Sequence, residues 1–397
     1  MNISKIHNCY GCGVCAISCT KNIISIELND NGFYEPRISD VNKCTDCGLC
    51  FDVCAYSHDE ISLQNLEIHS YAAWSNDSAV RRKCSSGGVG FELGRMMLSK
   101  GYKVCGVRYN AEVVRAEHYI ATTLEELIQS IGSKYIQSYT VDGFKGISRK
   151  EKYLVTGTPC QIDSFRRYIR RFRVEDNFVL MDFFCHGVPS MFVWQKYLKD
   201  VEKVVGKVTY ASWRNKWRGW HDSYNSLIKE RKTFVNSRLS QGDKFYALFL
   251  GDGCLGGACY DHCKYKYKHS SADIRIGDAW GTCYKKDEDG VSAVITFTSI
   301  GNEWLKKANL HIEQKPFDVV AELQIKKASK RTLITKILMK ELKKESSTID
   351  DVYAIQLLYN KLKRLIRRIS NPKKTIVNFF NRFSSSHSNK LNAPTLK

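Results

Sequence analysis

Apolar and polar positions form a repeated strand, turn and helix pattern in the middle of the chain. In the run KYLVTGTPCQIDSFRRYIRRF, an apolar strand ends at Gly157 and an amphipathic helix follows. Thr158 can cap this helix, Pro159 suits its first position, and Gln161 is spaced as a capping-box partner. We therefore predict a helix with Cys160 at its N-terminus, where a thiolate is electrostatically favoured.

Two further segments follow the same pattern. In FVLMDFFCHGVPS an apolar strand ends at Cys185, the chain turns, and Ser190 can cap the next helix. In CSSGGVGFELGRMMLSKGYKVCGVRY, residues 85–88 precede an amphipathic helix and then a strand. Taken alone, SSGG is more often a plain turn than a phosphate site. Because open α/β sheets bind ligands at the carboxyl ends of their strands, the three turns together predict one shared ligand-binding edge.

The two ends of the chain have different patterns. The segment ISIELNDNGFYEPRI alternates apolar and polar residues around Asn31-Gly32, which predicts a β-hairpin. Near the other end, apolar residues recur at helical spacing: Ile355, Leu358, Leu362, Leu365 and Ile369. Lys361, Arg364 and Arg368 lie between them, and Asn371-Pro372 ends the predicted helix. A shorter apolar segment follows, with Val377, Phe379, Phe380 and Phe383, and the final SSSHSNKLNAPTLK is predicted to be disordered.

Composition narrows the class of protein. The chain has 397 residues and 43% hydrophobic content, enough for about two to three domains with a buried core. No apolar run approaches the roughly 18 residues of a membrane span. The first twenty residues show no secretion-signal pattern, so we expect a reducing cytoplasmic location. There, 16 cysteines favour metal ligands over disulfides.

Charge is unevenly distributed along the chain. The 61 Lys and Arg residues outnumber the 41 acidic residues, yet residues 1–65 carry a net charge of −4 and residues 325–397 carry +14. A basic amphipathic helix followed by aromatic residues can lie on the surface of an anionic membrane. It can equally dock its apolar stripe on the protein's own core or on a partner. Nucleic-acid binding, which only the charge suggests, is not expected.

The N-terminal cysteines form an internal repeat. Residues 9–19 and 44–54 both follow the pattern C-x2-C-x2-C-x3-C, and the segment resembles a bacterial-type two-cluster ferredoxin module. In such modules the fourth cysteine of each run binds the other cluster. We therefore assign Cys9, Cys12, Cys15 and Cys54 to one [4Fe-4S] cluster, and Cys44, Cys47, Cys50 and Cys19 to the second. A pair of zinc sites is the weaker alternative. The chain departs from the family at Thr20 and Ala55, where a proline is usual.

A second resemblance covers residues 9–281. The phrases CSSGGV, IGSKYIQS, TGTPCQI, FFCHGVPS, SWRNKWRGW and ADIRIGDAWG, in this order, resemble the β-subunit family of coenzyme F420-reducing hydrogenases and dehydrogenases. The resemblance implies a flavoprotein in which FAD exchanges hydride with a deazaflavin or related donor and single electrons with iron–sulfur clusters. Carried over by position, the implied FAD-binding residues are Ser86, Gly87, Gly88, Ser133, Lys134, Tyr135, Gly157, Thr158, Pro159 and Gln161. Backbone amides and Lys134 suit the pyrophosphate, and Gln161 suits the flavin ring.

The same resemblance implies a further [4Fe-4S] cluster near the flavin. Its expected ligands are Cys160, Cys185, Cys259 and Cys263. The spacing in CYDHC exceeds that of the family by one residue, so Cys254 and Cys283 are candidate substitutes, and buried thiols without metal are the alternative. We expect Cys84 and Cys105 to be structural.

Two other features are candidates for hydride chemistry. His186 follows Cys185 and suits either a proton donor at the flavin or a hydrogen-bonded structural histidine. Cys160 is a second candidate for a catalytic role. The stretch WRNKWRGW mixes indoles with cations, which predicts a basic aromatic surface for a polyanionic donor, with Lys216 and Trp220 as candidates. Stacking on single-stranded nucleic acid is the weaker interpretation.

These expectations combine into an α+β protein in three parts. Residues 1–65 form a two-cluster ferredoxin module, residues 66–310 an α/β FAD domain, and residues 311–397 a basic helical tail. The predicted function is electron transfer between a hydride donor, F420-like or NAD(P)H, and a one-electron partner or substrate. The alternatives are a reductase of surface polysaccharide synthesis and a non-catalytic electron-carrier subunit of a larger complex. We expect a cytoplasmic protein that can contact the inner face of the membrane.

Overall fold

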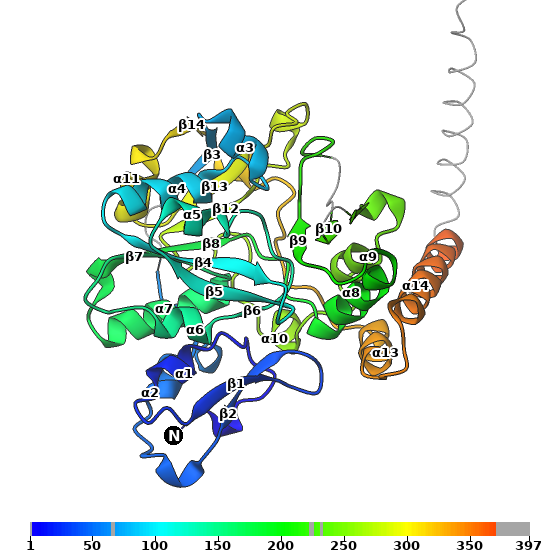
Figure 1. The fold of residues 1–397 in the computed structure, drawn as a ribbon, viewed down its shortest axis with the longest axis horizontal. Helices are drawn as coiled ribbons and strands as arrows, with labels where there is room; N and C mark the ends of the chain where they lie inside the picture. The colour runs from blue at the N-terminus through cyan, green and yellow to red at the C-terminus, as the bar shows by residue number, and fades with distance from the viewer. Residues whose placement is uncertain (1, 65–67, 222–225, 231–232, 371–397) are drawn as a thin grey trace, which may run out of the picture.

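The computed structural model describes residues 2–64, 68–221, 226–230 and 233–370 (Figure 1). It contains a small N-terminal module, a nine-stranded sheet between two layers of helices, and a lobe of helices with a three-stranded sheet. The predicted disordered end and the aromatic residues 377–383 lie outside the described residues.

The N-terminal module contains the predicted hairpin. Strands β1 (Ile24–Leu28) and β2 (Tyr34–Ile38) pair antiparallel, and Gly32 has a φ of +73° in the turn between them. Each cysteine run leads into a short helix, α1 (Val14–Ser18) or α2 (Leu49–Asp52), and both helices begin after a glycine in the left-handed region. Three single-turn 3₁₀ segments complete the module: Ile3–Lys5, Val41–Lys43 and Ala55–Ser57. The sequence repeat is therefore a structural repeat.

The large sheet is mixed, with a parallel centre. Its order is β14-β3-β13-β12-β8-β7-β4-β5-β6. Strands β12, β8, β7 and β4 are parallel to one another. Strands β13, β3 and β14 pair antiparallel with their neighbours, whereas β5 is antiparallel to β4 and parallel to β6. The strand bounds are β3 (His69–Ser75), β4 (Lys103–Asn110), β5 (Arg115–Ala121), β6 (Ser138–Tyr139), β7 (Tyr153–Thr156), β8 (Phe178–Phe183), β12 (Ile274–Asp278), β13 (Ser292–Thr296) and β14 (Leu310–Gln314).

Alternation along the central strands builds a core on each face of the sheet. Leu154 and Val179 face the layer of α4 (Val89–Ser99), α5 (Leu124–Ile128) and α11 (Ser299–Lys307). Val155 and Leu180 face α6 (Val141–Lys145) and α7 (Pro159–Arg171), and the N-terminal module adds Val53 to this second core. Alternating burial therefore fixes the register of the strands. Val53 joins the module to the core on the second face of the sheet. Helices α3 (Ser78–Lys83) and α12 (Phe317–Val320) lie near β3.

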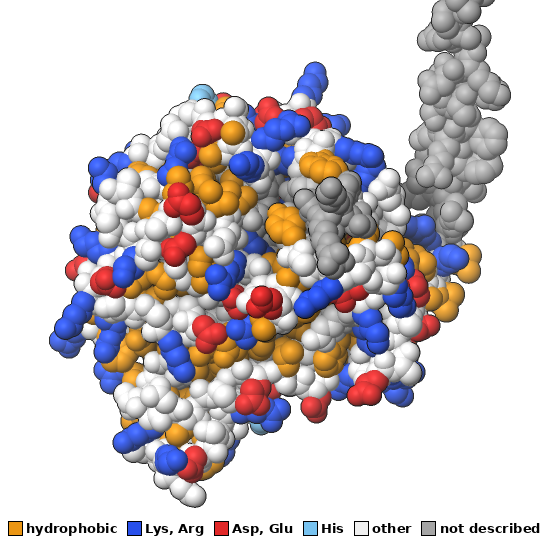
Figure 2. All heavy atoms as spheres, in the orientation of Figure 1, with side chains coloured by type: hydrophobic (Ala, Val, Ile, Leu, Met, Phe, Trp, Pro, Cys, Tyr) orange, Lys and Arg blue, Asp and Glu red, His pale blue; other side chains and the backbone are white. Residues whose placement is uncertain are grey.

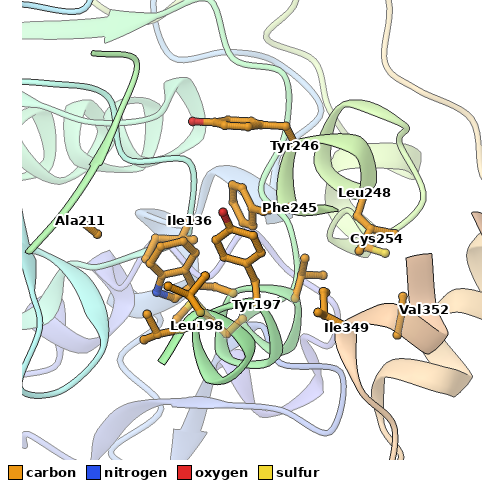
Figure 3. Packing of buried hydrophobic residues seen from close by; sticks show 14 of the residues in the cluster. Ile136, Tyr197, Leu198, Ala211, Phe245, Tyr246, Leu248, Cys254, Ile349 and Val352 are labelled. Carbon is orange, nitrogen blue, oxygen red and sulfur yellow. The ribbon is translucent and has the colours of Figure 1, made fainter. Parts of the chain in front are cut away.

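A third core joins the lobe to the rest of the molecule. Figure 3 shows Tyr197 of α8 (Met191–Val205) beside Phe245 of α9 (Lys244–Leu250), and Leu198 and Leu248 of the same two helices belong to this core. The remaining elements of the lobe are β9 (Tyr210–Trp213), β10 (Ser226–Glu230), β11 (Thr233–Ser237), α10 (Gly257–Asp261), α13 (Leu333–Leu342) and α14 (Ile349–Ser370). Short 3₁₀ segments are Glu175–Asn177, Leu239–Gln241 and Thr282–Tyr284.

The first part of the chain beyond residue 310 packs on the rest of the molecule. Strand β14 pairs with β3, so the sheet continues past the expected boundary. Ile334 of α13 and Val352 of α14 are buried in the lobe core. Among the described residues, no helix combines the length and the apolar character needed to cross a membrane.

Candidate functional site

Four cysteines from both N-terminal runs surround one small cavity. Cys9, Cys12, Cys15 and Cys54 line it together with apolar side chains such as Ile26. Burial raises the pKa of Cys12 to about 11 and that of Cys9 above its ordinary range. The fourth thiol comes from the second run because α1 and α2 pack side by side.

The other four N-terminal cysteines line a second cavity. Cys44, Cys47 and Cys50 meet Cys19 of the first run there. Cys47 is exposed and Cys50 is buried, so this cavity lies near the surface. The structure therefore groups the eight thiols in the two crossed sets expected from the sequence.

A third cavity lies between the module and the sheet. It is lined by Cys160 at the start of α7, Cys185 after β8, and Cys259 and Cys263 at and after α10. Cys9 also lines it, so the first and third cavities are neighbours. The candidate substitutes lie elsewhere, because Cys254 is buried in the lobe core and Cys283 is exposed.

The thiols fit clusters better than single ions. Within the part of the chain that the structure describes, no three Cys, His, Asp or Glu side chains converge closely enough to hold one metal ion. In a [4Fe-4S] cluster each thiolate binds a different iron, so the four sulfurs spread around a cavity. Four cysteines per cavity are the donor set that such a cluster needs.

The predicted capping box positions Cys160. The backbone N–H of Thr158 donates to Oε1 of Gln161 at 2.8 Å, and Nε2 of Gln161 donates to Oγ of Ser138 at 3.1 Å. The Thr158 hydroxyl lies 3.2 Å from the Cys160 sulfur. Both ends of the Gln161 amide are therefore used within the protein, which differs from the expected contact with a flavin ring.

Residues that the sequence analysis did not single out complete the third cavity. Lys266 Nζ donates to the carbonyl of Cys185 at 2.6 Å and to that of His186 at 3.0 Å, which holds this loop in place. Burial raises the pKa of Cys185, and the charge of Lys266 opposes that shift. Tyr10 and Tyr265 form another wall, with ring centroids 5.7 Å apart. The sequence signal that could have identified Tyr265 and Lys266 is the alternating KYKYK run of residues 264–268, which follows Cys263.

Ser86, Gly87 and Gly88 lie at the expected sheet edge. Gly88 caps α4 with a φ of +87°, the Gly87 N–H donates to Oγ of Ser292, and the Ser86 hydroxyl donates to the carbonyl of Val291. The Ser133 N–H donates to Oγ of Ser85 at 2.9 Å. Two of the implied FAD segments are therefore neighbours, although they are far apart in the sequence.

Three predicted ligand contacts differ from the structure. Lys134 donates to the carbonyls of Ser130, Ile131 and Gly132 at 2.9–3.0 Å, and burial lowers its pKa to about 7. Lys216 is 5% exposed and Trp220 is 2% exposed, so neither belongs to a basic aromatic surface. The physical reason is that backbone carbonyls surround both ammonium groups and offer the hydrogen bonds a phosphate would.

Lys216 supports the loop before α4, and Trp220 packs at the end of β12. Lys216 donates to the carbonyl of Arg81 at 2.8 Å and also to that of Ser86. The Trp220 indole donates to Asp278 at 2.9 Å and stacks on Trp280 with centroids 4.9 Å apart. The exposed indole of this stretch is Trp217, at 59% exposure.

His186 and Tyr135 face the lobe. Nε2 of His186 lies 2.9 Å from Oδ1 of Asp252 and 3.2 Å from the carbonyl of Phe249. The Tyr135 ring lies 5.4 Å from that of Phe249. The His186 imidazole therefore contacts the lobe, and its role as a proton donor stays a prediction.

Comparison with known proteins identifies the family of the chain. The family models described as coenzyme F420 hydrogenase/dehydrogenase, beta subunit, match residues 70–143 for the N-terminal part and 150–319 for the C-terminal part. The chain belongs to this family. A 4Fe-4S dicluster domain model matches residues 8–58. The predicted resemblance is therefore confirmed, and the match continues through β14 and into α12.

Individual relatives are more distant. The coenzyme F420 hydrogenase subunit beta of Methanococcus voltae is 28% identical over 222 residues, which are 53% of this chain and 72% of the relative. A solved xenon derivative of the F420-reducing [NiFe] hydrogenase complex from Methanosarcina barkeri matches with 21% identity and a TM-score of 0.45. That match covers 72% of this chain and 89% of the solved chain.

Proposed function

We propose that this iron–sulfur family member is an oxidoreductase that binds FAD and three [4Fe-4S] clusters. It would exchange electrons between a hydride donor, F420-like or NAD(P)H, and a one-electron partner. The observation that carries the proposal is the set of three cysteine cavities, two of which share Cys9 as a wall. When bound, a flavin handles both hydride and single electrons, whereas the clusters carry only single electrons.

The chain's own residues prepare these sites. Burial at Cys12 excludes water, and the α7 cap fixes the direction of Cys160. At the sheet edge, the N-terminus of α4 presents backbone N–H groups, which suit a pyrophosphate. Ser86 and Ser133 supply hydroxyls beside that terminus. We therefore propose FAD at this edge, with Lys134 and Lys216 acting as supports of the loops.

The second cavity is the proposed meeting point with a redox protein. Cys47 is exposed there, and the surrounding module carries a net charge of −4. Complementary charge accelerates association, so a partner with a basic face suits this end. The sixteen cysteines of the chain form no disulfide, which suits a reducing compartment.

Anaerobic purification with iron, sulfide and flavin analysis tests the proposal. About one flavin and about twelve irons per chain are expected. Protein without flavin, or with zinc in place of iron, would contradict the proposal. Reduction of a dye by F420H2, NADH or NADPH then identifies the donor.

A non-catalytic carrier subunit is the second candidate, because the relative from Methanococcus voltae is a subunit of a hydrogenase. It predicts a full set of clusters but no turnover with any hydride donor. Bleaching of bound flavin by one of these donors would exclude it.

A further inference from the structure

Helix α14 changes its environment halfway along its length. In its first half, Ile349, Val352 and Gln356 are buried, and the helix contacts α8, α9 and α13. From Leu358 onward the described side chains are exposed, except for the half-buried Tyr359. Figure 1 shows this second half extending away from the lobe. Docking on the protein's own core, one of the alternatives left open by the sequence, therefore applies to the first half of the helix only.

The exposed half has an apolar stripe. The exposed fractions are 59% for Leu358, 49% for Leu362, 54% for Leu365, 62% for Ile366 and 71% for Ile369. Spacings of three and four residues place these side chains on one side of a helix. Five large apolar side chains together form a patch that soluble proteins rarely expose without a use. Residues 358–370 extend over about 20 Å, at 1.5 Å per residue.

Positive charge accompanies this stripe. Lys361, Lys363 and Arg364 are exposed on the same half of the helix. Residues 352–397 contain ten Lys and Arg residues and no Asp or Glu. In Figure 2 apolar and basic side chains lie next to each other on the described part of α14, at the right of the view. An apolar stripe beside exclusively basic charge is complementary to a surface with an apolar interior and an anionic face.

We propose that residues 358–370 of α14 dock on an anionic lipid bilayer, parallel to its surface. The leucine and isoleucine side chains enter the boundary between headgroups and acyl chains, and the Lys and Arg side chains bind lipid phosphates. The buried first half of α14 fixes the body of the protein to this anchor. A lipid surface explains the one-sided charge, which an apolar protein groove does not require. The inference is independent of the proposed electron-transfer function.

Vesicle co-sedimentation of the full chain tests the proposal. We expect binding to vesicles of phosphatidylcholine mixed with phosphatidylglycerol, release at high salt, and little binding to phosphatidylcholine alone. The double variant Leu362→Glu and Leu365→Glu should weaken partitioning into vesicles about 100-fold or more, because it removes two apolar side chains that would enter the bilayer. The double variant Lys361→Gln and Arg364→Gln should weaken it about 30-fold.

Val204→Glu is the control, because Val204 is 77% exposed and belongs to α8 rather than to the stripe. It should bind vesicles like the unmodified chain. Iron content and circular dichroism should stay unchanged in all variants, since the replaced side chains are exposed. Absence of binding to anionic vesicles, or equal binding by the Leu362→Glu and Leu365→Glu variant, overturns the proposal. So does a lipid-free dimer in sedimentation equilibrium that the same variant abolishes, because a second copy would then cover the stripe.

Discussion

Cys54 shows how the role of a single residue depends on its partners in space. It is thirty-nine residues from Cys15 in the sequence, yet both line the first cavity. The ferredoxin pattern predicted this grouping because the crossed ligand follows from the repeat itself. By contrast, the environment of Lys216 could not be predicted, since carbonyls from separate parts of the chain, such as those of Arg81 and Ser86, surround its ammonium group.

Replacing Cys54 should remove one cluster. Cys54→Ala is expected to lower the iron content by about four per chain and to leave the second cavity's cluster in place. Anaerobic iron analysis with electron paramagnetic resonance measures this. Cys84→Ala is the control, because Cys84 is buried outside the three cavities and should keep all the iron. Unchanged iron in Cys54→Ala would contradict the crossed arrangement.

His118 should make stability depend on pH. Its side chain is 2% exposed, Nε2 lies 3.0 Å from the carbonyl of Thr156, and burial lowers its pKa to about 4. Between that value and its ordinary pKa of about 6.5, the unfolded chain binds a proton that the folded chain does not. The free energy of unfolding therefore falls as the pH drops, by up to about 1.4 kcal/mol per pH unit.

The variant His118→Gln should lack this contribution. Anaerobic urea unfolding between about pH 6.5 and about pH 5 should show a shallower pH slope for the variant than for the unmodified chain. His311→Gln is the control for replacing a histidine at a half-exposed position. Identical slopes for all three proteins would show that His118 is protonated as readily when folded as when unfolded.

At the scale of elements, local sequence signals were reliable where the local chain supplies all the partners. The β1–β2 hairpin, the strands β7 and β8, and the helices α4, α7 and α8 form where the patterns predicted them. Turn glycine, capping residues and apolar periodicity each act within a few residues. The antiparallel strands β13 and β14 lacked such signals, and β14 crosses the boundary expected at residue 310 because its partner, β3, lies far away in the sequence.

The cap of α7 gives an element-scale prediction. Gln161→Leu leaves the Thr158 N–H without its acceptor and should lower the free energy of unfolding by about 1–2 kcal/mol. Flavin content should stay the same, because the amide is used within the protein. Denaturant unfolding and flavin absorbance measure the two effects. Gln195→Leu on the exposed face of α8 should change neither. Loss of flavin without loss of stability would restore the predicted contact with the ring.

At the scale of the whole molecule, the fold brings three distant parts of the chain to one place. The third cavity is lined by the N-terminal module, the carboxyl ends of β7 and β8, and α10. The sequence predicted the four cysteines through the family resemblance. It could not predict that Cys9 borders both the first and third cavities, because that contact depends on how the module packs on α6 and α7.

Iron stoichiometry is the most direct test of the account. We expect about twelve irons and about twelve labile sulfides per anaerobically purified chain, and about eight of each in Cys160→Ala. Cys254→Ala, whose sulfur is buried in the lobe core, should keep about twelve. About eight irons in the unmodified chain, unchanged in Cys160→Ala, would show that the third cavity holds no cluster and would contradict the account.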